Sequence, residues 1–310
     1  MSAERITVGV YALDQVLLPK AAAKGWAARL AGSVPDLAAE AAPCALDFMD
    51  GPEGLVLAEA AGLSGTDWQA GTRALIEPVA GRAGLFLVRI GGKAAGLASA
   101  APWAAKTHWQ ADGPEQPEAL AAYAADALID TPDGPRPAGD LVAGDVVTTL
   151  GNGSRPLRWV GQRRVSAVEL LAHPDLRPVA FAPGTVGNSR ELMVSPQQRM
   201  LIDDWRAAVY FGEDRVLVSA LALVDDQAAR QILPQGGVDY VVLLCDRHEI
   251  LLAEGALSES FHPGEAGLAG LHASDRAKLA ALLPEAELAR RRAAYPIVRN
   301  AEARALRLRG

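Results

Sequence analysis

The sequence predicts a mainly β C-terminal domain, preceded by an α+β N-terminal domain and followed by short C-terminal helices. Three observations support this fold class. From Ala127 onward, short strand-like segments alternate with turn signals at regular intervals, which is typical of all-β domains. Two apolar runs, Val238 to Cys245 and Ile250 to Ala253, have the length and composition of buried strands. After Glu265 the apolar residues change to a helical spacing.

Length and charge limit the possible function. A chain of 310 residues is long enough for two domains with separate cores. The net charge of -7 argues against a nucleic-acid partner, because a phosphate backbone is bound by clustered Lys and Arg. No run is apolar and long enough to span a bilayer, so we expect no membrane insertion. The N-terminus lacks the pattern of a secretory signal, and we expect a cytoplasmic protein or export by a signal-peptide-independent route or within an assembly.

The N-terminal domain is expected over residues 1–115. Lys20 to Ala31 has helical spacing of its apolar residues. The polar, proline-bearing stretch from Asp112 to Pro117 is the best candidate for a linker. No motif in this domain indicates its role. Its expected strands include Ile6 to Leu13, Thr72 to Val79 and Gly84 to Ile90.

The β domain is expected over residues 116–268. Gly151-Asn152-Gly153 separates two strand-like segments and favours a hairpin, because glycine adopts positive φ without strain. The two apolar runs around Asp246-Arg247-His248-Glu249 predict a second tight hairpin. A helical extension follows over residues 269–310, beginning with a helix from Ser274 or Asp275 through Leu283.

The cysteines and histidines give no sign of a metal or a disulfide. The chain has two cysteines, Cys44 and Cys245, and both lie in apolar surroundings that predict burial. They do not form a disulfide framework or a pair with metal-ligand spacing, and the five histidines form no HxH or HExxH pattern. We expect no metal and no cofactor.

Three blocks of sequence together resemble a known family. They are LIDTPDGPRPAGDLVAGDVVTTLGNGSRPLRWVGQRRV from Leu128, LMVSPQQRMLIDDWRAAVYFGE ending at Glu213, and YVVLLCDRHEILLAEG with SESFHPGE ending at Glu265. The blocks occur in the order of the hedgehog/intein (Hint) self-processing family, and they are most similar to its bacterial Hint-2 branch. The resemblance implies a compact β horseshoe with two pseudo-symmetric halves.

The same resemblance implies a site for self-cleavage. In that family the first residue of the domain, usually Cys, attacks the carbonyl that precedes it, and a His protonates the departing amide. Aligned to the family's opening, Cys-Phe-x-x-Gly-Thr-x-Ile, this chain has Ala122 at the Cys and Ala127 at the Thr. In the Thr/Ser-x-x-His motif, Ser195 is retained and Gln198 replaces the His.

These replacements predict a non-cleaving Hint-like domain. The methyl group of Ala122 cannot attack a carbonyl, and the amide of Gln198 cannot act as a general acid near neutral pH. Asp246, Arg247 and His248 are retained, and we interpret them as a structural polar turn. The expected function is that of a scaffold or a module that binds an unidentified protein partner, within a larger assembly.

Two alternatives remain open. The domain could process itself through a non-Cys nucleophile such as Ser195. Alternatively, His248 with Asp246 could serve a hydrolase that acts on other molecules. Splicing of the kind seen in inteins that begin with Ala is disfavoured, because Asn300-Ala301 lacks the following Cys, Ser or Thr.

Overall fold

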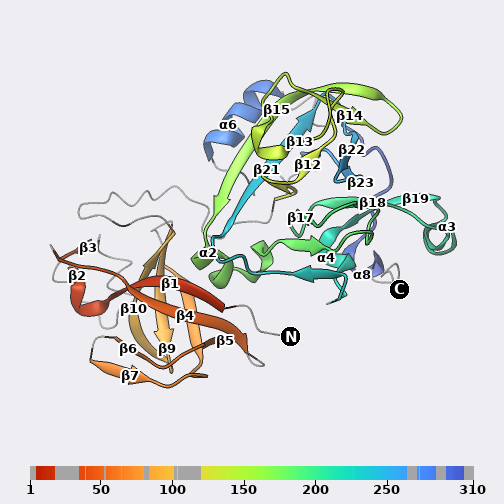
Figure 1. The fold of residues 1–310 in the computed structure, drawn as a ribbon. Helices are drawn as coiled ribbons and strands as arrows, with labels where there is room; N and C mark the ends of the chain where they lie inside the picture. The colour runs from red at the N-terminus through yellow and green to blue at the C-terminus, as the bar shows by residue number, and fades with distance from the viewer. Residues whose placement is uncertain are drawn as a thin grey trace. The chain divides into compact units, whose positions relative to one another are not determined.

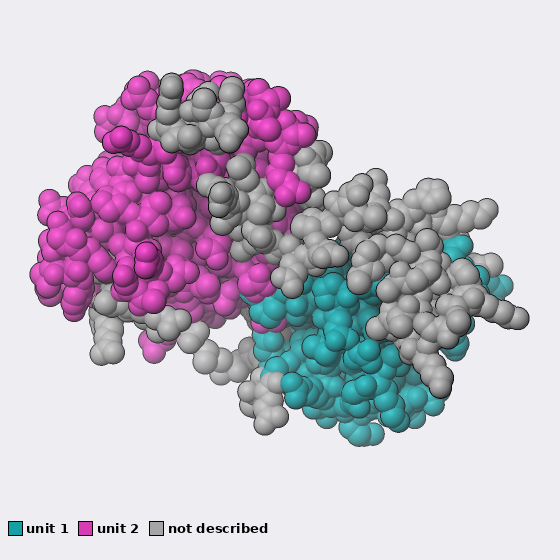
Figure 2. Space-filling view, turned by 180° about the vertical axis from the view of Figure 1, so that it is seen from behind, with its two compact units in different colours: residues 1–117, 165–174, 233–237 teal, residues 118–164, 175–232, 238–310 magenta. Residues whose placement is uncertain are grey.

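The computed structural model divides the chain into two compact units, coloured separately in Figure 2. Unit 1 comprises residues 1–117, 165–174 and 233–237, and unit 2 comprises residues 118–164, 175–232 and 238–310. The chain therefore passes from one unit to the other repeatedly. The structure describes residues 5–17, 35–38, 40–51, 54–63, 65–79, 84–100, 103, 120–225, 227–263, 271, 273–283 and 291–303. The expected linker at 112–117 and the expected helix at 20–31 lie outside these residues.

Unit 1 is built on a six-stranded antiparallel sheet with the order β5-β4-β1-β10-β9-β8 (Figure 1). The two outer strands also meet, because Val56 pairs with Arg73 and the Leu57 N–H donates to the Thr72 carbonyl at 3.0 Å. The sheet therefore closes on itself and leaves few unpaired edge groups. The strands are β1 (Arg5–Ala12), β4 (Cys44–Gly51), β5 (Gly54–Leu57), β8 (Ala74–Pro78), β9 (Leu85–Ile90) and β10 (Lys93–Ser99). Small ladders add β2 (Val16–Leu17) with β3 (Asp36–Leu37), and β6 (Ala61–Leu63) with β7 (Thr66–Trp68).

The three predicted strands of this region are confirmed as β1, β8 and β9. In β1 every second residue is buried, as expected for a strand with one face on a core. The burial predicted for Cys44 is wrong, because this residue is exposed. It has the inward parity of Leu46 and Phe48, which are buried, but as the first residue of β4 it lies at the strand end.

A helix from the middle of the sequence belongs to unit 1. This helix, α2 (Ala167–Ala172), begins with a capping box in which Ser166 and Glu169 bond to each other's backbone N–H. It packs on β1 and β8. His173, which follows it, meets the ring of Phe86 edge-on at 6.4 Å. Residues far apart in the sequence thus build one core.

Unit 2 is mainly β, as predicted, and its strands form one curled sheet (Figure 1). The main path runs β19-β18-β23-β22-β14-β15-β21-β11-β17-β16-β20. The strands are β11 (Tyr123–Ala124), β12 (Leu128–Ile129), β13 (Arg136–Pro137), β14 (Val146–Thr149), β15 (Gly153–Val165), β16 (Val179–Phe181), β17 (Leu192–Val194), β18 (Arg199–Asp203), β19 (Arg215–Ser219), β20 (Ala229–Gln231), β21 (Val238–Cys245), β22 (Ile250–Ala253) and β23 (Ala256–Glu259). The helices are short: α3 (Trp205–Phe211), α4 (Ala220–Leu223), α6 (Ala273–Leu282) and α8 (Asn300–Ala303).

One predicted hairpin is confirmed and the other is wrong. β14 and β15 pair across the Gly-Asn-Gly turn, with Thr149 opposite Gly153. β21 and β22 do not pair. Instead β22 pairs with β23 through a two-residue turn at Glu254 and Gly255, which both have positive φ as this tight hairpin requires. β23 pairs along one side of β22, and β12 and β14 pair along its other side. Residues 246–249 therefore connect β21 to β22 although these two strands are not neighbours in the sheet.

The C-terminal segment closes one edge of unit 2. Ile297 forms a parallel bridge with Leu217 of β19, and Ser219 bonds to the Asn300 side chain at 2.7 Å. The expected helix at Ser274 is confirmed as α6. Among the residues that the structure describes, no helix combines the length and apolar character needed to cross a membrane.

Candidate functional site

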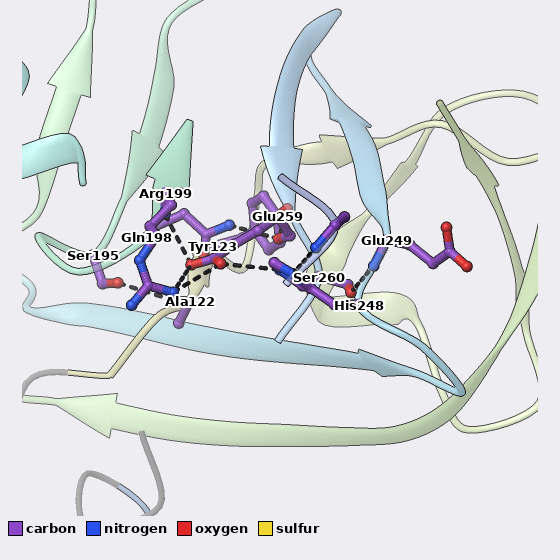
Figure 3. Close-up of polar contacts among 10 residues, drawn as sticks. Ala122, Tyr123, Ser195, Gln198, Arg199, His248, Glu249, Glu259 and Ser260 are labelled. Carbon is purple, nitrogen blue, oxygen red and sulfur yellow. Dashed lines mark hydrogen bonds and ion pairs between the residues drawn. The ribbon is translucent and has the colours of Figure 1, made fainter. Parts of the chain in front are cut away.

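The polar centre of unit 2 begins at Ala122 and Ser195, which lie side by side and buried (Figure 3). β11 pairs with β17, and this register sets Ala122 opposite the residue that follows the strand. The Ala122 N–H donates to the Ser195 hydroxyl at 2.9 Å, and the Ser195 N–H donates to the Ala122 carbonyl at 2.9 Å. The structure therefore brings together the two residues that the sequence assigned to one site.

Gln198 lies one turn after Ser195 and is also buried. Its N–H donates to the Ser195 carbonyl at 3.1 Å, which closes the turn. Its side-chain amide donates to the Glu259 carbonyl at 2.8 Å (Figure 3). The amide thus has a structural partner, and it has no proton to transfer near neutral pH.

Glu259 is the hub of this centre. Its side chain is fully buried and pairs with Arg199 at 3.0 Å and with His248 Nε2 at 3.0 Å. Its carbonyl also accepts from the Tyr123 hydroxyl at 2.7 Å, and that hydroxyl meets the Ser258 hydroxyl at 2.8 Å. Burial raises the pKa of Tyr123 far above its ordinary value, so the phenol stays protonated. The buried carboxylate is therefore paired and hydrogen-bonded, as a buried charge requires.

His248 has both ring nitrogens engaged. Its Nδ1 accepts the Ala294 N–H at 2.9 Å, so the ring proton belongs on Nε2, which donates to Glu259. The ring is consequently held as one tautomer within a structural network.

His262 stacks on this imidazole, with ring centroids 4.7 Å apart. Its Nδ1 is buried and has no hydrogen-bond partner among the described residues. Burial, together with the neighbouring His248, lowers the pKa of His262 to about 4. The ring is therefore neutral at physiological pH.

A family model matches a range that lies mostly in this unit, and a solved structure is similar to part of the chain. Residues 121–265 match the model of the Hint domain. Residues 121–265 form a Hint domain. The solution structure of a bacterial intein-like domain from Clostridium thermocellum is similar at 12% identity and a TM-score of 0.32, covering 46% of this chain and 99% of that one. No curated protein matches the chain.

The Hint domain begins at the site just described, since its match starts one residue before Ala122. Ala127 lies a short way into the domain, in the hydrophobic core of the unit. Its backbone bonds to Ala124 and Ala138, and its methyl group offers the scissile position no hydrogen bond. Among the described residues, no acidic side chain or imidazole bonds to the Ser195 hydroxyl.

The retained turn of the Hint domain divides into exposed and buried residues. Asp246 and Arg247 are exposed, and Asp246 faces Arg158 at 3.6 Å. His248 is buried and takes Glu259 as its carboxylate partner. The hydrolase alternative requires His248 to pair with Asp246, and the structure does not pair them.

Cys245 is the one buried thiol among the described residues of the Hint domain. Burial raises its pKa to about 12, which leaves almost no thiolate at neutral pH. No group of three or more His, Cys, Asp or Glu residues that could hold a metal occurs in the part of the chain that the structure describes.

Sequence reasoning missed the roles of Tyr123, Arg199 and Glu259. The signal was present in Ser258-Glu259-Ser260, three consecutive polar residues at the end of β23. In the structure all three are fully buried. Buried polar residues in such a run indicate a hydrogen-bonded network, because unsatisfied polar groups are costly to bury.

Proposed function

We propose that this Hint domain does not cleave its own chain and acts as a scaffold or protein-binding module. The observation that carries the proposal is the identity of the residue at the domain's first position, where the family has its nucleophile. Two hydrogen bonds hold Ala122 against Ser195, but the side chain of Ala122 is a methyl group, which is not a nucleophile. Without a nucleophile there, the acyl shift has no first step.

The acid position supports the same conclusion. General acid catalysis contributes about 10²- to 10⁴-fold in rate, and Gln198 supplies none of it. Its amide is instead committed to the Glu259 carbonyl. Both ring nitrogens of His248 already have hydrogen-bond partners, Glu259 and the Ala294 N–H, so this residue does not take over the role of the missing histidine.

The network around Glu259 supports a scaffold role. Tyr123, His248 and the adjacent pair Gln198 and Arg199 come from three separate segments, and all four residues bond to Glu259. A buried network in which every member has a partner fixes a single arrangement of the strands. Such rigidity suits a domain that presents a surface to a partner.

The test is the mass of the purified full chain, measured under denaturing conditions before and after incubation with thiol or hydroxylamine. We expect a single mass near 32.4 kDa in every sample. Fragments that correspond to residues 1–121 and 122–310 would overturn the proposal. A Ser195→Ala variant is the matched control, because loss of such fragments in that variant would assign the cleavage to Ser195.

A further inference from the structure

α3 of unit 2 presents three large apolar side chains to solvent. Trp205, Val209 and Tyr210 are 72%, 66% and 56% exposed. The helix itself is well anchored, because Ala207 is buried and Phe211 packs against the core of the unit. Exposed aromatic groups on an anchored element mark an interaction surface. Figure 1 shows α3 beside β19.

Beside this helix lies a cavity of about 570 Å³. Its lining includes Trp205 and Ala208 of α3, and Tyr295 with Pro296 of the C-terminal segment. The remaining lining is charged and comprises Asp203, Asp204, Glu213, Asp214 and Arg215. The cavity lining thus combines two aromatic side chains with four acidic ones.

The ion pairs of the cavity leave a negative excess. Asp203 pairs with Arg215 at 2.8 Å, and Asp204 pairs with Arg206 at 2.8 Å. The guanidinium of Arg206, together with the backbone N–H of the same residue, holds the pKa of Asp204 at about 2. This carboxylate is therefore ionised, and Arg206 balances its charge. Glu213 and Asp214 are exposed and have no ion pair among the described residues.

We infer that this cavity binds an arginine side chain from an exposed segment of a protein partner. A guanidinium stacks on an indole face and donates in a fork to carboxylates, and it is weakly hydrated, so both kinds of group here suit it. Val209 and Tyr210 would then contact the apolar neighbours of that arginine. The inference deepens the proposed function, since it names the surface and the chemistry by which the module recognises its partner.

The probe is a short, amidated, fluorescently labelled peptide of alternating glycine and arginine, titrated with the full chain and followed by anisotropy. The control peptide carries citrulline, a neutral group of the same shape, in place of arginine. We expect saturable binding of the arginine peptide, and binding at least about tenfold weaker for the citrulline peptide. Raising the salt concentration should weaken only the arginine peptide, because exposed charges are screened.

Two variants locate the site. Trp205→Ala should weaken binding of the arginine peptide by about fivefold, and the double variant Glu213→Gln with Asp214→Asn should weaken it by a similar factor. The matched controls are Val146→Ala, which truncates an exposed apolar residue elsewhere, and Asp133→Asn with Glu191→Gln, which removes two other exposed acids. Both controls should bind within about twofold of the unaltered chain.

Four outcomes would overturn the inference. The first is no saturable binding of the arginine peptide, and the second is equal binding of the citrulline peptide. The third is unchanged affinity in the Trp205 and Glu213/Asp214 variants. The fourth is dimerisation of the unaltered chain that Trp205→Ala abolishes, which would assign the surface to a second copy. None of them bears on cleavage, which the mass measurement decides separately.

Discussion

His248 accepts a hydrogen bond at Nδ1 from the backbone N–H of Ala294, 46 residues further along the chain, at 2.9 Å. This contact joins the centre of the Hint domain to the segment that follows it. Because the bond fixes the tautomer of His248, it also fixes the orientation of the donor that reaches Glu259. The segment after the domain therefore completes the domain's polar centre.

The first prediction concerns restoration of chemistry. A double variant with Ala122→Cys and Gln198→His supplies a thiol where the methyl group stands and a titratable ring beside it. We expect thiol-induced cleavage before residue 122, at least about 100-fold faster than in either single variant, because nucleophile and acid act as a unit. Time-resolved mass measurement of the fragments checks this. Equal rates in the double and single variants would show that the remaining site cannot support the shift.

The second prediction concerns the hub of the network. Glu259→Gln leaves Arg199 and His248 beside a neutral amide, so we expect the free energy of unfolding to fall by about 3 kcal/mol. The matched control is Asp239→Asn, which breaks an exposed pair with Arg164 and should cost less than about 1 kcal/mol. Urea unfolding of both variants measures the difference. A similar fall in the free energy of unfolding of both variants would mean that burial does not strengthen the ion pairs of Glu259.

The third prediction concerns pH. The pKa of His262 is about 4 in the folded chain and about 6.5 when unfolded, so the unfolded chain takes up its proton first as pH falls. The stability that depends on neutral His262 is complete above pH 6.5 and is lost between about pH 6.5 and about pH 4, by about 2–3 kcal/mol. Urea unfolding at several pH values measures the loss. The loss of unfolding free energy on acidification should be smaller in His262→Phe. An unchanged dependence of that free energy on pH in this variant would show that His262 is not the group responsible.

The fourth prediction concerns the two thiols. Cys44 is exposed and should react with iodoacetamide in the folded protein. Cys245 is buried with a pKa of about 12, so its alkylation should be at least about 100-fold slower until denaturant is added. Mapping the alkylated peptides by mass spectrometry measures both rates. Rapid labelling of Cys245 in the folded chain would reveal a reactive thiol close to Tyr123 and reopen self-processing.

Much of the local structure could be predicted from the sequence, because it depends on local signals. The Gly151-Asn152-Gly153 turn and the apolar alternation of β1 each follow from neighbouring residues. Sequence motifs assigned Ala122 and Ser195 to one site, and in the structure the Ala122 N–H bonds to the Ser195 hydroxyl.

The pairing of β22 could not be read from its own sequence. Its apolar residues are compatible with pairing to β21 or to β23. The Glu254-Gly255 turn brings β23 to one side of β22, and β12 and β14 pair along the other side. Likewise the bond between Ala294 and His248 depends on tertiary packing across many residues, for which the sequence has no periodic signal.

The interleaving of the two units has a consequence for any cut at the start of the Hint domain. Residues 165–174 and 233–237 lie downstream of Ala122, yet they belong to unit 1, where α2 packs on β1 and β8. Severing the bond before Ala122 would therefore yield a nicked protein whose two pieces stay clasped by that packing. Separation of the two fragments would thus be opposed by the topology of the chain.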